Sequence, residues 1–144
     1  MRWLVLITLL LALLSQLTAG QDTVMRAATR YVPGVTWRAK SVVTGDFTCG
    51  GRRQTAILGT SATEIVVAVF LNGTDKRPEV IRSSGRQSNS VTLTTEDLDY
   101  ELDYTLPGFQ RSKTCKGLVL DDGEVDPAHF YWNHESLRFD AWSL

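Results

Sequence analysis

Most of the chain consists of short segments in which hydrophobic positions are either continuous or alternate with polar ones, and this pattern predicts strands. Segment 65–70 is apolar at every position, which is typical of a central strand covered on both faces. Segments 90–94 and 96–104 carry apolar side chains at every second position, which predicts strands with one polar or charged face. By these criteria, extended segments are expected over 37–43, 54–58, 64–71, 78–82, 90–94, 96–104, 116–120, 129–132 and 137–142.

One short helix is predicted over residues 23–31, with Asp22 as its N-cap and Pro33-Gly34 directly after its end. Apolar side chains fall at helical spacing on one face of it, namely Val24, Ala27, Ala28 and Tyr31. Short strands that follow a single helix indicate a mainly β (α+β) fold. We therefore expect an antiparallel sheet or small barrel of about 6–8 strands with one short N-terminal helix.

The first twenty residues have the three-part pattern of a secretory signal peptide. Arg2 supplies the positive charge, residues 3–14 are almost wholly apolar, and small or polar residues follow. This apolar segment of about 12 residues is shorter than the roughly 20 that a membrane-spanning helix needs. We expect cleavage near Ala19 or Gly20, a single β-rich domain over 21–144, an extracytoplasmic location (periplasmic or secreted) and no stable membrane anchor.

Two cysteines, Cys49 and Cys115, are present, and an even count in an exported chain predicts a disulfide. The bond would close a loop of about 67 residues and stabilise the fold by roughly 4 kcal/mol, through the entropy of the unfolded chain. A catalytic cysteine is the alternative, but the sequence contains no C-x-x-C motif.

Segment Gly45–Gly59 contains the most informative motif, a Gly-Asp-Phe triplet followed by a glycine pair and an apolar strand. It resembles one degenerate repeat of the FG-GAP or VCBS type. In such a repeat, carboxylates at the first, third, fifth and ninth loop positions hold calcium. Asp46 occupies the first position, and Gly51 occupies the sixth, where a glycine allows the sharp turn.

The remaining ligand positions of this loop have lost their carboxylates. Positions three, five and nine are Thr48, Gly50 and Gln54, and two arginines lie beside them. The resemblance therefore implies the turn without its calcium ion, and we expect no metal and no cofactor. A disulfide from Cys49 to Cys115 would hold the loop where calcium holds it in the repeat.

Charge is distributed unevenly along the chain. Residues 21–95 hold ten Lys or Arg and five Asp or Glu, a net +5, whereas residues 96–144 hold four and eleven, a net −7. Tyrosines next to carboxylates in the acidic part would make a contact surface for a protein or sugar partner. The binding residues expected there are Tyr100, Glu101, Asp103, Tyr104 and Tyr131. Attraction between two halves of one fold is the alternative explanation of the charge, and core packing is the alternative role of the aromatic rings.

A second acidic cluster, residues 121–126, precedes His129 and invites a metal or acid–base hypothesis. Its spacing matches no metal-ligand motif, and His129 and His134 would point to opposite faces of one strand. No nucleophile elbow, zinc-protease motif or phosphate-binding loop is present. An acidic turn and ordinary hydrogen bonding at a hairpin are the structural alternatives, and the missing motifs weigh against an enzyme.

Three classes of function remain. The first is an exported small binding protein, such as a periplasmic inhibitor or immunity-type protein, that meets a basic protein partner through an acidic aromatic face. The second is a structural or accessory envelope domain with a degenerate calcium-repeat loop. The third is a hydrolase that uses carboxylates of residues 121–126 with His129. The formal net charge of −1 argues against a nucleic-acid partner.

Overall fold

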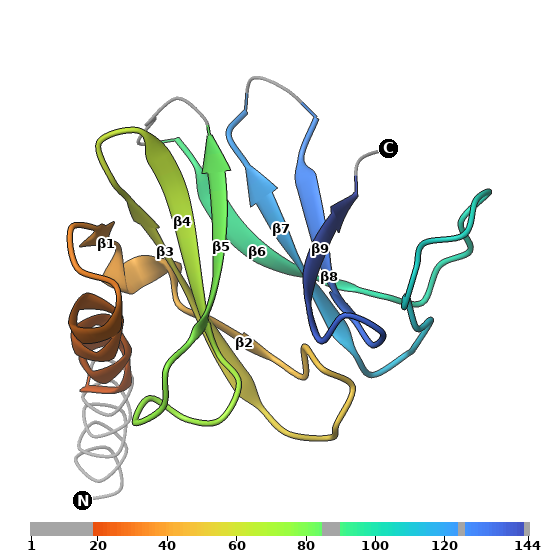
Figure 1. Cartoon of the computed structure of the whole chain (residues 1–144), viewed down its shortest axis with the longest axis horizontal. Coiled ribbons are helices and arrows are strands. Elements are labelled where there is room, and N and C mark those ends of the chain that lie inside the picture. Colours follow the sequence, from red (N-terminus) through yellow and green to blue (C-terminus); the bar gives the residue numbers. More distant parts are fainter. Residues whose placement is uncertain (1–18, 85–89, 124–125, 143–144) are drawn as a thin grey trace, which may run out of the picture.

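Two antiparallel β-sheets, packed face to face, form the body of the protein (Figure 1). The computed structural model describes residues 19–84, 90–123 and 126–142, so all but the last two residues of the predicted signal peptide lie outside the described residues. The expected mainly β fold with an N-terminal helix is confirmed. In the described part of the chain the strands form two sheets, not a closed barrel, and they number nine instead of about 6–8.

The first sheet consists of β1 (Thr36–Trp37), β2 (Val43–Gly45), β3 (Gln54–Thr60), β4 (Glu64–Phe70) and β5 (Glu79–Ser84). Its order is β1-β3-β4-β5, and β2 also pairs with β3. The second sheet consists, in order, of β6 (Thr92–Asp97), β7 (Lys116–Asp121), β8 (Ala128–Asn133) and β9 (Arg138–Trp142). The hairpin predicted near the C-terminal end is confirmed as β8 and β9.

The segment predicted to be extended over 37–43 is broken by a 3-10 turn, Ala39–Ser41. The Ser41 hydroxyl explains the break, because it accepts from the Leu58 N–H (2.9 Å) and donates to the Arg38 carbonyl (2.7 Å). The Arg38 N–H in turn donates to the Leu58 carbonyl (2.9 Å). A side chain thus supplies the ladder hydrogen bond that the turn removes, and both short strands stay paired with β3.

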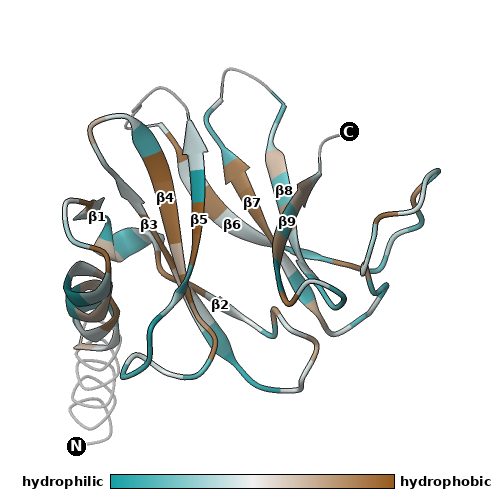
Figure 2. Ribbon diagram, in the orientation of Figure 1, coloured by the Kyte–Doolittle hydropathy of each residue, from teal (hydrophilic) through white to brown (hydrophobic). Residues whose placement is uncertain are grey.

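Alternation along β4 divides its apolar side chains between two cores. Positions 65, 67 and 69 share a core with Leu118 and Phe130 of the second sheet, and positions 66, 68 and 70 share a core with the N-terminal helix. β4 is therefore covered on both faces, as its continuous apolar run predicted, and Figure 2 shows most of it in brown. Full burial of such a side chain stabilises the fold by roughly 1.5–3 kcal/mol.

The N-terminal helix packs on the outer face of the first sheet (Figure 1). Val24, Ala27 and Ala28 are buried there, as their helical spacing predicted. The prediction that Asp22 is the N-cap is wrong, because the helix already includes residues 19–22 and Asp22 lies inside it. Among the described residues, no helix is both long enough and apolar enough to cross a membrane.

Residues 98–115, which connect β6 to β7, cover the outer face of the second sheet, and we call this segment the lobe (Figure 1). The strand predicted over 96–104 is wrong beyond Asp97, where pairing with β7 ends. The apolar side chains of 98–102 instead pack in a third core with Tyr131 and Trp142. Alternation requires only that one side of the chain be apolar, and a loop that lies on a sheet meets this requirement as well as a strand does.

Candidate binding site

Hydrogen bonds from β8 and the turn after it hold the middle of the lobe in place. The Tyr131 hydroxyl donates to the Pro107 carbonyl (2.9 Å), and the His134 N–H donates to the Gly108 carbonyl (3.0 Å). Gly108 has a φ of +61°, and a Cβ there would lie 1.9 Å from the Asn133 Oδ1 atom. Only glycine fits this contact, because any side chain would push the lobe away from the hairpin.

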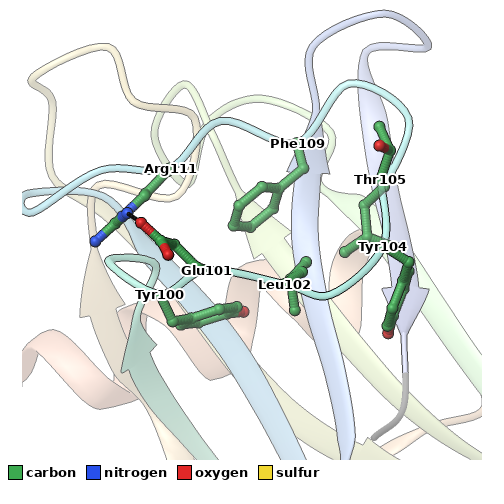
Figure 3. Close-up of a pocket in the computed structure, with 8 residues that line it drawn as sticks. Tyr100, Glu101, Leu102, Tyr104, Thr105, Phe109 and Arg111 are labelled. Carbon is green, nitrogen blue, oxygen red and sulfur yellow. Dashed lines mark hydrogen bonds and ion pairs between the residues drawn. The ribbon is translucent and has the colours of Figure 1, made fainter.

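The lobe carries a hollow of about 370 Å³ (Figure 3). Its lining residues are Tyr100, Glu101, Leu102, Tyr104, Thr105, Leu106, Phe109 and Arg111. The Tyr100 and Phe109 rings pack with their centroids 5.7 Å apart, and Tyr104 is 50% exposed. A pre-formed concave surface with aromatic walls and a few polar groups is typical of a binding site.

Arg111 compensates much of the negative charge of the lobe. Its Nε and one terminal nitrogen lie 2.9 Å from the Asp99 Oδ1 atom and 2.6 Å from the Glu101 Oε1 atom, respectively. These hydrogen bonds raise the pKa of the Arg111 guanidinium. Because the lobe also contains Lys113, its three carboxylates leave a net charge of only −1. The acidic character expected of this surface is therefore smaller than the charge of residues 96–144 implies.

The structure brings together three of the five predicted binding residues, because Tyr100, Glu101 and Tyr104 line the hollow. Asp103 is exposed on the same segment but does not line the hollow. Tyr131 belongs to the core, since it is only 2% exposed and its ring packs 5.5 Å from that of Phe109. The core-packing alternative thus holds for Tyr131, and burial raises the pKa of its phenol.

Glu96 of β6 and His129 of β8 form a polar pair beneath the lobe that the sequence analysis did not predict. The His129 Nδ1 atom lies 2.9 and 3.0 Å from the two Glu96 carboxylate oxygens, and both side chains are largely buried. The pair crosses β7 at Gly117, where a Cβ would lie 3.1 Å from the Glu96 Oε1 atom. The Trp142 ring stacks on the imidazole at 4.6 Å. A glycine inside the predicted strand 116–120 was the available signal, because it marks a close approach of other groups.

Tyr100 lies close to this pair and stays a neutral phenol. Burial raises the pKa of its hydroxyl, and the charge of Glu96 raises it further. Its ring packs 5.4 Å from that of Trp142. The cluster therefore joins β6, β8, β9 and the lobe, which favours a role in holding the lobe on the sheet.

In the described part of residues 121–126, the carboxylates of the hydrolase hypothesis lie apart from the Glu96–His129 pair. Asp122 and Asp126 line a separate small hollow with Ser83 and Ser84, whereas His129 bonds to Glu96 on the outer face of the second sheet. The Asp121 carboxylate accepts a hydrogen bond from the Gly123 N–H (2.8 Å), as in an acidic turn. Position 124 lies outside the described residues.

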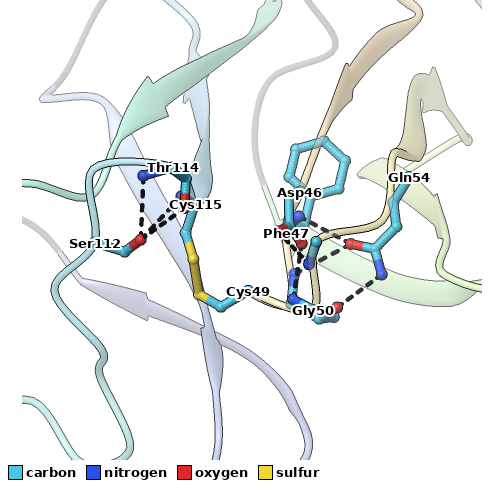
Figure 4. Close-up of a disulfide and its surroundings, with 10 residues drawn as sticks. Asp46, Phe47, Cys49, Gly50, Gln54, Ser112, Thr114 and Cys115 are labelled. Carbon is cyan, nitrogen blue, oxygen red and sulfur yellow. Dashed lines mark hydrogen bonds between the residues drawn. A yellow bond between two sulfur atoms is a disulfide. The ribbon is translucent and has the colours of Figure 1, made fainter.

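The loop that resembles a calcium-binding repeat is held by direct bonds (Figure 4). The two Asp46 carboxylate oxygens accept hydrogen bonds from the Gly50 N–H (3.0 Å) and the Gly51 N–H (2.7 Å). The predicted disulfide is confirmed, and the Cys49–Cys115 bond ties this loop to the end of the lobe. This bond is compatible with an oxidising, extracytoplasmic compartment.

Gln54 closes the loop from inside the protein. It is 2% exposed, and its Oε1 atom accepts from the Phe47 N–H (2.8 Å) and the Thr48 N–H (3.1 Å). Its Nε2 atom donates to the Thr48 hydroxyl (2.8 Å). These residues fit a calcium ion poorly, because Asp46 is the single carboxylate of residues 46–54 and both of its oxygens accept N–H groups of the loop. Within the described residues, no three His, Cys, Asp or Glu side chains are grouped to hold a metal ion.

Comparison with known proteins gave no match: no family model, no curated protein and no solved structure matches this chain. The likeness of Gly45–Gly59 to an FG-GAP or VCBS repeat is therefore a resemblance carried by those residues alone. The fold and the site define a small disulfide-bonded β-protein whose lobe bears a pre-formed aromatic hollow.

Proposed function

We propose that this protein is an exported binding module of the inhibitor or immunity type, which captures a protein partner through the lobe. The observation that supports it most is the hollow walled by Tyr100, Tyr104 and Phe109. Tyrosine is enriched among the residues that dominate the energy of protein interfaces. A partner side chain placed in the hollow would bury these rings further.

Anchoring of the lobe supports the same proposal. A loop that is already ordered loses little conformational entropy on binding, so more of its contact energy appears as affinity. The lobe has this property, because Leu98 is buried at its start, the Tyr131 hydroxyl holds Pro107 in its middle, and Cys115 is bonded at its end.

The chemistry of the hollow favours a lysine or arginine side chain of the partner. Glu101 lies beside the aromatic rings and is 85% exposed. A cation gains energy over an aromatic face, and the Glu101 carboxylate adds to this only in part, because its Oε1 atom already pairs with Arg111. A partner with a basic surface would therefore place one cationic side chain here, and the exposed Asp103 next to the hollow would assist its approach.

Charge reversal at an exposed lobe residue tests the proposal. The oxidised protein is immobilised, and proteins from extracytoplasmic extract are captured at low salt and identified by mass spectrometry. Asp103→Lys should weaken capture of one saturable partner at least about tenfold, which equals about 1.4 kcal/mol. Asp75→Lys makes the same charge change in the turn between β4 and β5, and it serves as the matched control.

Thermal unfolding of both variants verifies that each is folded. Equal capture by Asp103→Lys and Asp75→Lys would remove the exposed carboxylate from the binding surface, and unchanged capture by Tyr104→Ala, which removes one wall of the hollow, would remove the lobe from it. Absence of any stoichiometric partner, with the Cys49–Cys115 bond intact, would instead favour the structural or accessory envelope domain.

A further inference from the structure

We propose a second binding site, for a tetrahedral oxyanion of the phosphate or sulfate type, between the loop 46–53 and the start of β7. A hollow of about 500 Å³ lies there. Its lining residues are Thr44, Gly45, Asp46, Gly51, Arg52, Arg53, Thr114 and Lys116. The site goes beyond the proposed function, and it shares no residue with the hollow of the lobe.

Two positive charges in this hollow lack an ion-pair partner among the described residues. Arg52 and Arg53 are exposed, and neither makes an ion pair with any residue that the structure describes. Asp46 is the carboxylate of the lining, and both of its oxygens are engaged by backbone N–H groups of its own loop. An incoming anion would therefore meet two guanidinium groups, whose forked N–H donors match the geometry of phosphate and sulfate.

Lys116 supplies the third cation of the hollow. Its ammonium group pairs with Asp97, so it holds a position at the rim and remains partly exposed. Thr44 and Thr114 also belong to the lining, and the Thr114 hydroxyl shares a hydrogen bond with the Ser112 hydroxyl (3.3 Å). Asp97 balances the charge of Lys116, so Arg52 and Arg53 against the Asp46 carboxylate leave the hollow with an excess of one positive charge, although the whole chain has a net charge of −1.

The two elements that carry these cations are fixed to each other. The Lys116 N–H donates to the Asp46 carbonyl (3.0 Å), and the Cys49–Cys115 disulfide lies beside this bond. A Cβ at Gly45 would lie 2.9 Å from the Lys116 Cβ atom, so the glycine permits the close approach of β2 and β7. The charged side chains therefore extend from a rigid base, which lowers the entropic cost of binding an anion.

Titration with inorganic phosphate and, separately, with glycerol 3-phosphate tests the site. The oxidised protein is titrated by calorimetry at low ionic strength, because salt screens exposed charges. We expect saturable one-to-one binding, with chemical-shift changes at the Gly51 and Thr114 amides. Binding of both compounds indicates recognition of the oxyanion alone, and binding of glycerol 3-phosphate alone indicates a phosphate ester.

Matched double variants separate this site from bulk charge. Arg52→Gln with Arg53→Gln should weaken binding at least tenfold. Lys76→Gln with Arg77→Gln removes the same charge from the turn between β4 and β5, and it should change binding less than twofold. Replacement of Arg52 and Arg53 by lysine keeps the charge but loses the forked donors, so affinity should fall between wild type and the glutamine variant.

Absence of saturable binding of either compound would overturn the proposal, and so would equal losses in the two glutamine double variants. Thermal unfolding verifies that each variant is folded. Because Asp103→Lys does not alter this hollow, failure of the oxyanion site and failure of the lobe as a binding surface are distinguishable.

Discussion

Replacement of Gln54 by leucine tests whether one buried side chain closes the loop 46–53. The change keeps a side chain of similar size but removes the acceptor of two backbone N–H groups. Phe47 is 0% exposed, so its N–H has no water to replace the lost acceptor. Thr48 is partly exposed, so its N–H is less affected.

The expected magnitude follows from these two groups. An unsatisfied buried N–H costs about 1–3 kcal/mol, and the Phe47 N–H belongs near the upper end because it lies in the core. The Thr48 N–H adds about 1 kcal/mol at most. We therefore expect Gln54→Leu to lower the free energy of unfolding by about 3 kcal/mol. For a domain of this size, that loss lowers the melting temperature by roughly 10 °C or more.

Urea unfolding followed by tryptophan fluorescence measures the change in free energy, and hydrogen exchange of the Phe47 amide reports whether the loop opens. Gln110→Leu is the matched control, because Gln110 is exposed on the lobe. The control should stay within about 0.5 kcal/mol of wild type. If Gln54→Leu also stays within that range and the Phe47 amide remains protected, the Gln54 side chain does not close the loop.

Three further predictions follow from the disulfide, the loop and the buried tyrosines. Reduction of the Cys49–Cys115 bond, which spans a sequence separation of 66 residues, should lower the free energy of unfolding by about 4 kcal/mol. Equal urea midpoints with and without reductant would contradict this. Chelation of divalent ions should leave the melting temperature unchanged, because hydrogen bonds already close the loop, and a calcium-dependent rise would refute that account. Stability should fall as the pH rises above about 10. The pKa values of Tyr100 and Tyr131 are raised in the folded state, so the stability from their neutral phenols is complete below the unfolded-state pKa and is lost above it. Tyr100→Phe should reduce the loss of stability at alkaline pH. An unfolding free energy with the same pH profile in the variant and in wild type would contradict this role of Tyr100.

Local sequence patterns predicted correctly the elements whose buried face is defined by the spacing of their own apolar residues. The spacing of Val24, Ala27 and Ala28 predicted the buried face of the helix, and the apolar run 65–70 predicted a strand covered on both sides. Each signal is a period within one element, so no knowledge of distant segments is needed to interpret it.

Local patterns gave wrong or incomplete predictions where a side chain forms hydrogen bonds with a residue distant in sequence or with the backbone of a loop. Ser41 interrupts a predicted extended segment because it bonds to Leu58 of another strand. Gln54 was interpreted only as a missing calcium ligand, although its amide group satisfies two backbone N–H groups of the loop. The hydrogen-bond partners of Ser41 and of Gln54 cannot be identified from the spacing of residues along the chain.

The candidate site shows the same division. The tyrosines and carboxylates of residues 100–104 marked a contact surface in the sequence, and three of them line the hollow. Their charge was misjudged, because Arg111 binds back onto Asp99 and Glu101.

By itself, the sequence determined the fold class, the helix, the doubly covered strand and the disulfide partners, because these depend on local periodicity and on a cysteine count of two. Only the tertiary structure decided that residues 98–115 form a lobe and that Tyr131 is buried beneath it. It also decided that Glu96 and His129 meet across Gly117. Each of these results depends on contacts between segments far apart in the chain, and a one-dimensional pattern does not record such contacts.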